Sequence, residues 1–239
     1  MPSRFVRLST AALLLAVTAA AGRAQPAAKP GAKGAGGWTW LFNGTSTDAW
    51  RGYQMKTMPA GWSIKDGTLT KSGSVEDLIS KDEWGNFELE FEWKLGKGGN
   101  SGVFYRATEE YPKVYWSATE YQLLDDAGHP DGKNPLTSAA AAYALYAPPR
   151  GVVKPADQWN SSRIVVRGTH AEHWLNGKKV VEYEYGSPDW TAKVKASKFG
   201  EWANYGKAAK GHVAIQGDHD GQLALRNIRI RAISPKEPK

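Results

Sequence analysis

The fold class is decided by the stretch Phe87-Glu-Leu-Glu-Phe-Glu-Trp-Lys94. Its odd-numbered positions are aromatic or aliphatic, and its even-numbered positions are charged. A period of two is typical of an antiparallel strand with one face in a core and the other in solvent. The acidic face of this strand is therefore interpreted as solvated rather than catalytic.

Similar short segments follow one another along the chain, and Asn176-Gly177 between two of them is a strong signal for a type I′ hairpin turn. Helical periodicity is almost absent, so the sequence predicts an all-β protein, a two-sheet antiparallel β-sandwich of the jelly-roll kind. The strands expected in addition to 87–94 lie at 61–70, 102–106, 120–124, 163–167, 171–175, 179–185, 212–216 and 223–230.

Two long connections, 125–135 and 185–210, are long enough to shape a pocket. Between them, residues 139–144 are mostly alanine and follow Ser138, a residue type that often caps helices. A single helical turn is expected there.

The first residues have the layout of a secretory signal peptide, with two arginines before an apolar run and small residues up to Ala24. We expect cleavage after Ala24, which makes 1–24 the signal peptide and predicts an exported protein, periplasmic or secreted. Residues 25–37 are rich in Ala, Pro, Gly and Lys and are interpreted as a flexible leader. A single folded domain is expected at 38–235, without a membrane anchor, because the apolar run is too short to span a bilayer.

Composition narrows the function classes. The formal charge of +7 becomes +4 when the three arginines of residues 1–24 are removed, and the remaining lysines are scattered, so nucleic-acid binding is not indicated. The chain has no cysteine, which excludes disulfides and thiolate metal sites. Eleven tryptophans and ten tyrosines suit a sugar-binding surface, although core packing by itself is the better explanation of such a number.

Candidate site residues are polar side chains on otherwise apolar strands, because a buried polar group costs free energy unless it is paired or in use. Glu120 and Gln122 share one face of their expected strand and suit sugar hydroxyls, with Glu120 as a general acid or base. The alternative for Glu120 is a structural ion pair with Arg106 or Arg163. His173 is the second catalytic candidate, although a lone histidine on an apolar face is more often structural.

The remaining candidates are assigned to substrate binding. His170 and His173 lack a third ligand at metal spacing, so zinc is not expected there. Asp220 is interpreted as part of a polar turn. The substrate-binding candidates are Tyr105, Arg106, Gln122, Asp125, Asn160, Arg163, Gln216, His219 and Arg226.

Seven motifs in order resemble the 3-keto-disaccharide hydrolase family over essentially the whole chain after the leader. They are Trp40-Leu-Phe-Asn-Gly44, Gly99-Asn-Ser-Gly-Val-Phe-Tyr-Arg106, Glu120-Tyr-Gln-Leu-Leu-Asp125, Trp159-Asn160, His173-Trp-Leu-Asn-Gly177, Gln216-Gly-Asp-His219 and Arg226-Asn-Ile-Arg229. The family usually has Gln-Asp-His near its end, and here Gly217 is inserted. The resemblance implies a concanavalin A-like lectin/glucanase fold and cleavage of glycosides already oxidised at C3.

In that chemistry a C3 ketone acidifies the C2 proton, the glycosidic oxygen leaves by elimination, and water then adds. Our hypothesis is that Glu120 or His173 handles the C2 proton, with Arg106 and Gln122 polarising the ketone or holding hydroxyls. A divalent ion could assist, with Glu120, Asp125 and His219 as ligands, and an oxidoreductase partner would supply the ketone. The alternatives are a non-catalytic carbohydrate-binding module and an ordinary glycoside hydrolase acting on unoxidised glucans.

Overall fold

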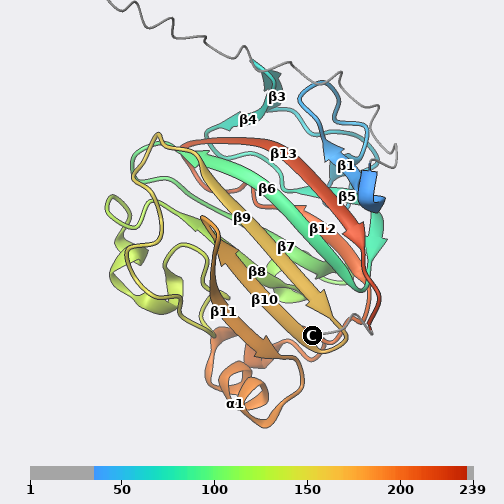
Figure 1. Ribbon diagram of the computed structural model, residues 1–239, viewed down its shortest axis with the longest axis vertical. Helices are drawn as coiled ribbons and strands as arrows, with labels where there is room; N and C mark the ends of the chain where they lie inside the picture. Colours follow the sequence, from blue (N-terminus) through green and yellow to red (C-terminus); the bar gives the residue numbers. More distant parts are fainter. Residues whose placement is uncertain (1–34, 236–239) are drawn as a thin grey trace, which may run out of the picture.

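The structure is a computed structural model that describes residues 35–235 (Figure 1). The expected signal peptide and nearly all of the expected leader lie outside these residues. The strands are β1 (Thr39–Phe42), β2 (Trp50–Gly52), β3 (Trp62–Lys65), β4 (Thr68–Ser72), β5 (Leu78–Trp84), β6 (Phe87–Leu95), β7 (Asn100–Ala107), β8 (Thr119–Leu124), β9 (Asn160–Arg167), β10 (His170–Leu175), β11 (Lys178–Glu184), β12 (Gly211–Ile215) and β13 (Gln222–Ala232).

These strands form two antiparallel sheets, which confirms the predicted β-sandwich. The larger sheet has the order β11-β10-β9-β6-β13-β4-β3, with β1 also paired to β13. The smaller sheet has the order β2-β5-β12-β7-β8. In Figure 1 the larger sheet crosses in front of the smaller one.

Helices are few and short. The α-helix α1 (Pro188–Ala196) lies at one end of the sandwich (Figure 1), and no helix among residues 35–235 has the length and apolar character of a membrane span. The 3-10 helices are η1 (Ala35–Gly37), η2 (Val114–Trp116), η3 (Pro130–Lys133), η4 (Pro135–Thr137) and η5 (Lys198–Glu201).

The core fills the space between the sheets. Phe91 of β6 meets Tyr121 of β8 edge to face with ring centres 5.7 Å apart, which joins the two sheets at the centre of the sandwich. The apolar positions of the strand 87–94 are buried as their period predicts.

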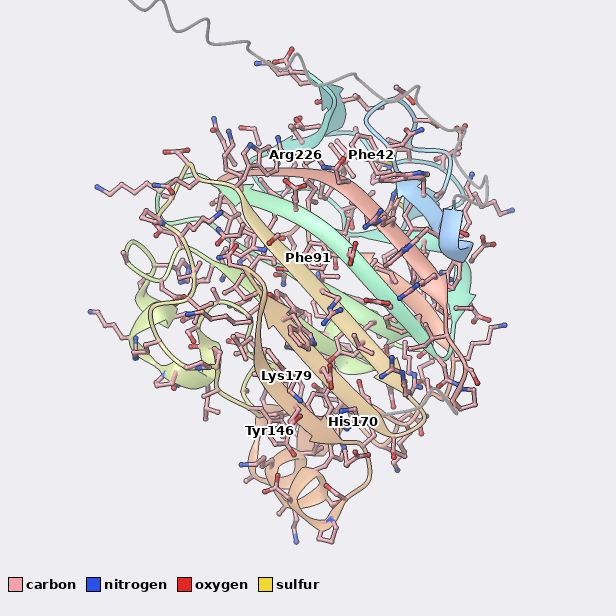
Figure 2. The ribbon with its side chains drawn as sticks, in the orientation of Figure 1. Phe42, Phe91, Tyr146, His170, Lys179 and Arg226 are labelled. Carbon is pink, nitrogen blue, oxygen red and sulfur yellow. The ribbon has the colours of Figure 1, made fainter. Side chains whose placement is uncertain are left out.

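The acidic face of β6 meets arginines of β13. Glu90 accepts hydrogen bonds from Arg229 at 2.8 and 2.5 Å, and Arg231 pairs with Glu88, which also accepts from Arg163. Figure 2 shows the side chains of this sheet. These carboxylates are thus neutralised by partners on neighbouring strands.

Residues 139–144 do not form the expected helical turn. Ala140 donates to the carbonyl of Gln122 at 2.8 Å, and Ala142 bridges to Tyr121 and Tyr146. The segment extends the edge of β8 because that strand offers it backbone partners. Ala140 and Ala144 have φ values of 68° and 62°, outside the helical range.

Candidate active site

A cavity of about 180 Å³ lies on the outer face of the smaller sheet, where β7, β8 and the end of β12 come together. Strand alternation on β8 points Glu120 and Gln122 into it, while Tyr121 and Leu123 pack in the core. The lining residues are Asn100, Tyr115, Glu120, Gln122, Asp131, Tyr143, Lys198, Gln216, Asp218 and His219.

The segment after β12 brings Gln216 and His219 to the same cavity. The inserted residue, Gly217, must be a glycine, because a β-carbon there would lie only 2.6 Å from the carbonyl oxygen of Glu76. Its N–H donates to Asp77 Oδ1 at 2.7 Å, and the Lys71 ammonium donates to the carbonyl of His219. These backbone contacts hold the segment against the strands.

Four buried side-chain oxygens in the cavity wall have no hydrogen-bond partner within the described part of the chain. They are Asn100 Oδ1, Gln122 Oε1, Gln216 Oε1 and Asp218 Oδ1. Leaving one such atom unpaired costs about 1–3 kcal/mol. A ligand that brings several O–H donors, such as a sugar, would pair them.

Glu120 is 5% exposed, and its burial raises the pKa of its carboxyl to about 8. The positive charge of Lys198 opposes this shift. At neutral pH the side chain is therefore mostly protonated, so it can donate a proton or a hydrogen bond.

His219 is partly buried, and desolvation lowers the pKa of its imidazole below 6.5, although Asp218 acts in the opposite direction. The ring is therefore mostly neutral at pH 7 and able to accept a proton. One cavity thus holds a carboxyl with a raised pKa and an imidazole with a lowered one, the pattern of a general acid and a general base.

Lys198 adds a cation to the cavity. Its Nζ lies 4.5 Å from the ring centre of Tyr143 and 5.3 Å from that of Tyr115, and it forms no ion pair with any described residue. The aromatic rings position the ammonium without neutralising it. A positive group that is free of a carboxylate can stabilise negative charge on a substrate oxygen.

The comparisons with known proteins agree with this fold. Residues 37–231 match the sequence model of the 3-keto-alpha-glucoside-1,2-lyase-like domain. The chain belongs to this family. A 3-keto-disaccharide hydrolase of Bacteroides thetaiotaomicron is 34% identical over 83% of this chain and 79% of its own.

Two solved structures of putative glycosyl hydrolases from Parabacteroides distasonis share the fold. One has a TM-score of 0.77 and 30% identity over 83% of this chain and 94% of its own. The other has a TM-score of 0.61 and 29% identity over 77% of this chain and 99% of its own. The predicted family resemblance is confirmed.

Contrary to the hypothesis that it is catalytic, His173 lies in the core between the sheets and not at the cavity. It is 0% exposed, its Nδ1 is 2.9 Å from the carbonyl of Ala140, and its Nε2 is 2.7 Å from the hydroxyl of Tyr105. Burial lowers the pKa of the imidazole to about 4. A substrate cannot reach this ring, so the structure corrects its expected position.

Tyr105 and Arg106 also lie elsewhere. The Tyr105 hydroxyl is part of the same buried network as His173 and contacts the Tyr183 hydroxyl at 2.5 Å. Arg106 lines a different groove and donates to the carbonyls of Gly85 and Gly168. Neither side chain reaches the cavity, because Tyr105 points inward and Arg106 stands at the far end of β7.

Three further substrate-binding candidates belong to the larger sheet. Arg226 donates to Glu92 at 2.8 and 2.6 Å, and its guanidinium lies 4.1 Å from the ring centre of Trp159. Arg163 pairs with Glu88, and its guanidinium lies 4.0 Å from the ring centre of Trp174. Asn160 accepts from Asn176 and from the backbone of Lys154. Partners on the larger sheet or in its connecting loops satisfy all three side chains.

Asp125 does not join Glu120 and His219 in the cavity wall. Its Oδ2 accepts from the N–H of Gly98 at 2.8 Å and so fixes the turn before β7. The proposed set of three ligands for a divalent ion is therefore not assembled.

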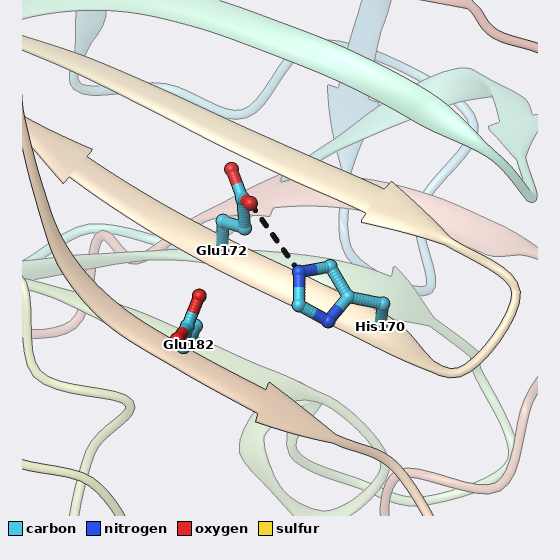
Figure 3. A group of neighbouring side chains, drawn as sticks. All are labelled: His170, Glu172 and Glu182. Atoms are coloured by element: carbon cyan, nitrogen blue, oxygen red, sulfur yellow. Dashed lines mark hydrogen bonds and ion pairs between the residues drawn. The ribbon is translucent and has the colours of Figure 1, made fainter. Parts of the chain in front are cut away.

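Within residues 35–235, one group of three His, Asp or Glu side chains has ligand atoms close enough together to hold a metal. It consists of His170, Glu172 and Glu182 on β10 and β11 (Figure 3). Lys179 contacts both of these carboxylates, and Trp174 donates to Glu172 at 2.7 Å. These side chains already bind one another through ion pairs and hydrogen bonds, so the group is interpreted as a surface network of ion pairs.

Sequence reasoning missed six residues of the cavity: Asn100, Tyr115, Asp131, Tyr143, Lys198 and Asp218. Asn100 shares its face of β7 with Gly102, so strand alternation could have found it. The other five stand on short 3-10 helices or loops, where no periodicity indicates the direction of a side chain.

Proposed function

We propose that this protein cleaves the glycosidic bond of 3-keto-glycosides or 3-keto-disaccharides by elimination followed by hydration. The observation that carries the proposal is the cavity in which Glu120 has a raised pKa and His219 a lowered one. Membership in a glycoside-cleaving family and a relative named 3-keto-disaccharide hydrolase support it.

Elimination next to a ketone needs a base, an acid and a group that stabilises the enolate. In our proposal, neutral His219 takes the proton from C2, and the electron pair of that bond forms the enolate of the C3 ketone. The C1–O bond then breaks, a double bond forms between C1 and C2, and protonated Glu120 gives its proton to the leaving oxygen. Water adds its hydroxyl to C1 and a proton to C2, which completes a net hydrolysis.

Lys198 would stabilise the enolate. Negative charge grows on the C3 oxygen only as the C2 proton leaves, so a fixed cation there favours the transition state over the bound substrate. The unpaired oxygens of Asn100, Gln122 and Gln216 would accept hydrogen bonds from sugar hydroxyls. In this proposal His219 takes the role of base that was expected for His173. Lys198 takes the role at the ketone that was expected for Arg106.

A second candidate is an ordinary glycoside hydrolase that uses two carboxylates. Asp131 and Asp218 line the same cavity as Glu120, so either of them could act as the second carboxylate of such an enzyme. Such an enzyme would cleave sugars that carry no ketone. A carbohydrate-binding module would bind them without cleavage.

The deciding experiment incubates the purified protein with a 3-keto-disaccharide and with its unoxidised parent, and follows free sugars by chromatography. Cleavage of the keto form alone, with exchange of the C2 proton in heavy water, supports elimination. Cleavage of the unoxidised parent supports an ordinary glycoside hydrolase that uses two carboxylates. Binding without cleavage supports a carbohydrate-binding module. His170→Gln, outside the cavity, is the control for His219→Gln.

We further propose that the protein works outside the cytoplasm, on the basis of residues 1–24, and that an oxidoreductase acting at sugar C3 supplies its substrate. Fractionation of cells that express the full chain tests the location. A protein that stays in the cytoplasm with residues 1–24 uncleaved would contradict it.

A further inference from the structure

A second hollow, the Arg106 groove, lies at the end of the sandwich beside α1 and has a volume of about 770 Å³. Its lining includes three cations, Arg106, Lys195 and Lys207, and no Asp or Glu among the described residues. Apolar walls come from Tyr185, Trp190 and Trp202. The size is that of a small-molecule site, and the charge is of one sign.

Arg106 is the unusual member of this lining, because it is only 8% exposed and has no carboxylate partner in residues 35–235. Its Nε and Nη2 donate to the carbonyl of Gly85 at 3.1 and 2.9 Å, and Nη2 also donates to the carbonyl of Gly168 at 2.9 Å. Nη1 has no protein acceptor among these residues. Carbonyls accept from Nε and Nη2 but leave the buried positive charge of Arg106 uncompensated.

The backbone at Arg106 carries a second signal. Its φ is 54°, in the left-handed region that favours glycine. His212 pairs with Ala107 and Ala214 with Phe104, so β7 has one extra residue at this point and forms a β-bulge against β12. Bulges redirect side chains, and strain of this kind is kept where it serves a function.

We propose that the Arg106 groove binds a small ligand that carries a carboxylate on a ring. The carboxylate of the ligand would accept hydrogen bonds from Arg106 Nη1. Nε and Nη2 already donate to protein carbonyls, whereas the two hydrogens of Nη1 have no acceptor among the described residues. The ring would lie against Trp190 and Trp202, which supply apolar surface beside the charge. Lys195 and Lys207, both exposed, would add attraction at the mouth.

This site does not depend on the proposed cleavage reaction. The groove and the cavity around Glu120 share no lining residue, and Lys198, which lines the cavity, is absent from the groove. Trp202 of the groove stacks on Trp116, with ring centres 4.0 Å apart, and does not line the cavity.

Titration calorimetry with two pairs of probes tests the proposal. Benzoate and D-glucuronate carry a ring carboxylate, and benzamide and D-glucose are their neutral counterparts. We expect saturable binding at one site for at least one acid, with the neutral counterpart at least about tenfold weaker, the loss expected for one charge-assisted hydrogen bond. Which acid binds more tightly identifies an aromatic or a sugar body.

Arg106→Gly is the matched variant, because glycine adopts the observed backbone without strain while it removes the guanidinium. We expect it to weaken acid binding at least about tenfold. If its melting curve shows that it does not fold, the double variant Lys195→Met/Lys207→Met, on exposed positions, is expected to weaken binding severalfold. Absence of acid binding to the folded protein, equal binding of the neutral probes, or unchanged binding in the folded variants would overturn the proposal.

Discussion

The carboxylate of Glu120 lies directly over Gly102 on the neighbouring strand. A β-carbon at position 102 would come within 2.2 Å of Glu120 Oε1 and within 2.8 Å of its Cδ. Gly102 pairs in register with Gln122, so the missing side chain leaves room for a carboxyl group between two strands. This room allows a buried carboxyl to lie flat against the sheet and face the cavity.

Gly102→Ala should therefore reduce activity by displacing Glu120. The Glu120 side chain must move when the methyl group occupies its place, and a shift of about 1 Å in a catalytic group can cost about 100-fold in rate. Measured kcat/KM on a 3-keto-disaccharide gives the effect. Gly96→Ala is the control, since a β-carbon there meets nothing closer than 3.6 Å. Full activity in Gly102→Ala would remove Glu120 from the reaction.

The pH dependence of kcat/KM should be bell-shaped. Activity requires neutral His219, whose pKa lies below 6.5, and protonated Glu120, whose pKa is about 8, so it should fall on either side of that interval. Glu120→Gln should lower activity by about 10²–10⁴-fold and abolish the alkaline limb of what remains. His219→Gln should abolish the acid limb. Activity that instead rises through pH 8 would make Glu120 the base.

The alternating strands were predictable because each has one face in the core. The period of two at 87–94 predicted β6, and the positive φ values of Asn176 and Gly177, 50° and 81°, confirm the hairpin turn between β10 and β11. The strands β1, β2 and β5 were missed. They are short or, like β5, change from buried to exposed part-way, so periodicity does not reveal them.

The helix α1 was also missed, within a segment expected to be a loop. Ser187 accepts from the N–H of Trp190, and Pro188 occupies the first turn, so the capping signal was present.

The residues of the cavity were predictable only in part, because not all of them lie on strands. Glu120 and Gln122 come from a strand and Gln216 follows directly after one, whereas Lys198 comes from a 3-10 helix whose place depends on tertiary packing.

Lys198→Met should lower kcat more than it raises KM. The ammonium is proposed to act on charge that appears in the transition state, and loss of one such group typically costs about 10²–10³-fold in kcat. The alkaline limb should also move to higher pH, because Lys198 lowers the pKa of Glu120. Lys198→Arg should retain part of the activity.

Lys193→Met is the matched control for this variant. Lys193 also lies over a tyrosine ring, at 5.1 Å from the centre of Tyr146, but outside the cavity. A loss in Lys193→Met equal to that in Lys198→Met would show that general charge, and not the position of Lys198, causes the effect.

Glu120 should make the protein less stable as pH rises. Its pKa is about 8 in the folded state and near 4.5 in the unfolded chain, so the folded protein binds the proton more tightly between these values. The stabilisation is complete below pH 4.5 and is lost as pH rises towards 8, by up to about 1.4 kcal/mol per pH unit. Denaturant unfolding of wild type and Glu120→Gln across this interval measures it. Parallel pH profiles for the two proteins would contradict the buried, neutral carboxyl.

His173 should matter for stability and not for catalysis. His173→Phe removes a ring that bonds both the carbonyl of Ala140 and the hydroxyl of Tyr105, and each broken bond in a buried site costs about 1–3 kcal/mol. We expect a lower free energy of unfolding, with kcat per folded molecule within about twofold of wild type. His173→Gln, which keeps a donor and an acceptor, should lose less.

The pH dependence of stability gives an independent check on His173. Its pKa is about 4 in the folded state and about 6.5 in the unfolded chain, so folding favours the neutral ring. That contribution is complete above pH 6.5 and is lost as pH falls towards 4, because the unfolded chain then takes up a proton that the core excludes. His173→Phe should therefore show a shallower loss of stability than wild type over this interval. A folded His173→Phe protein with abolished turnover would instead return this histidine to the reaction, through a path that the buried geometry does not provide.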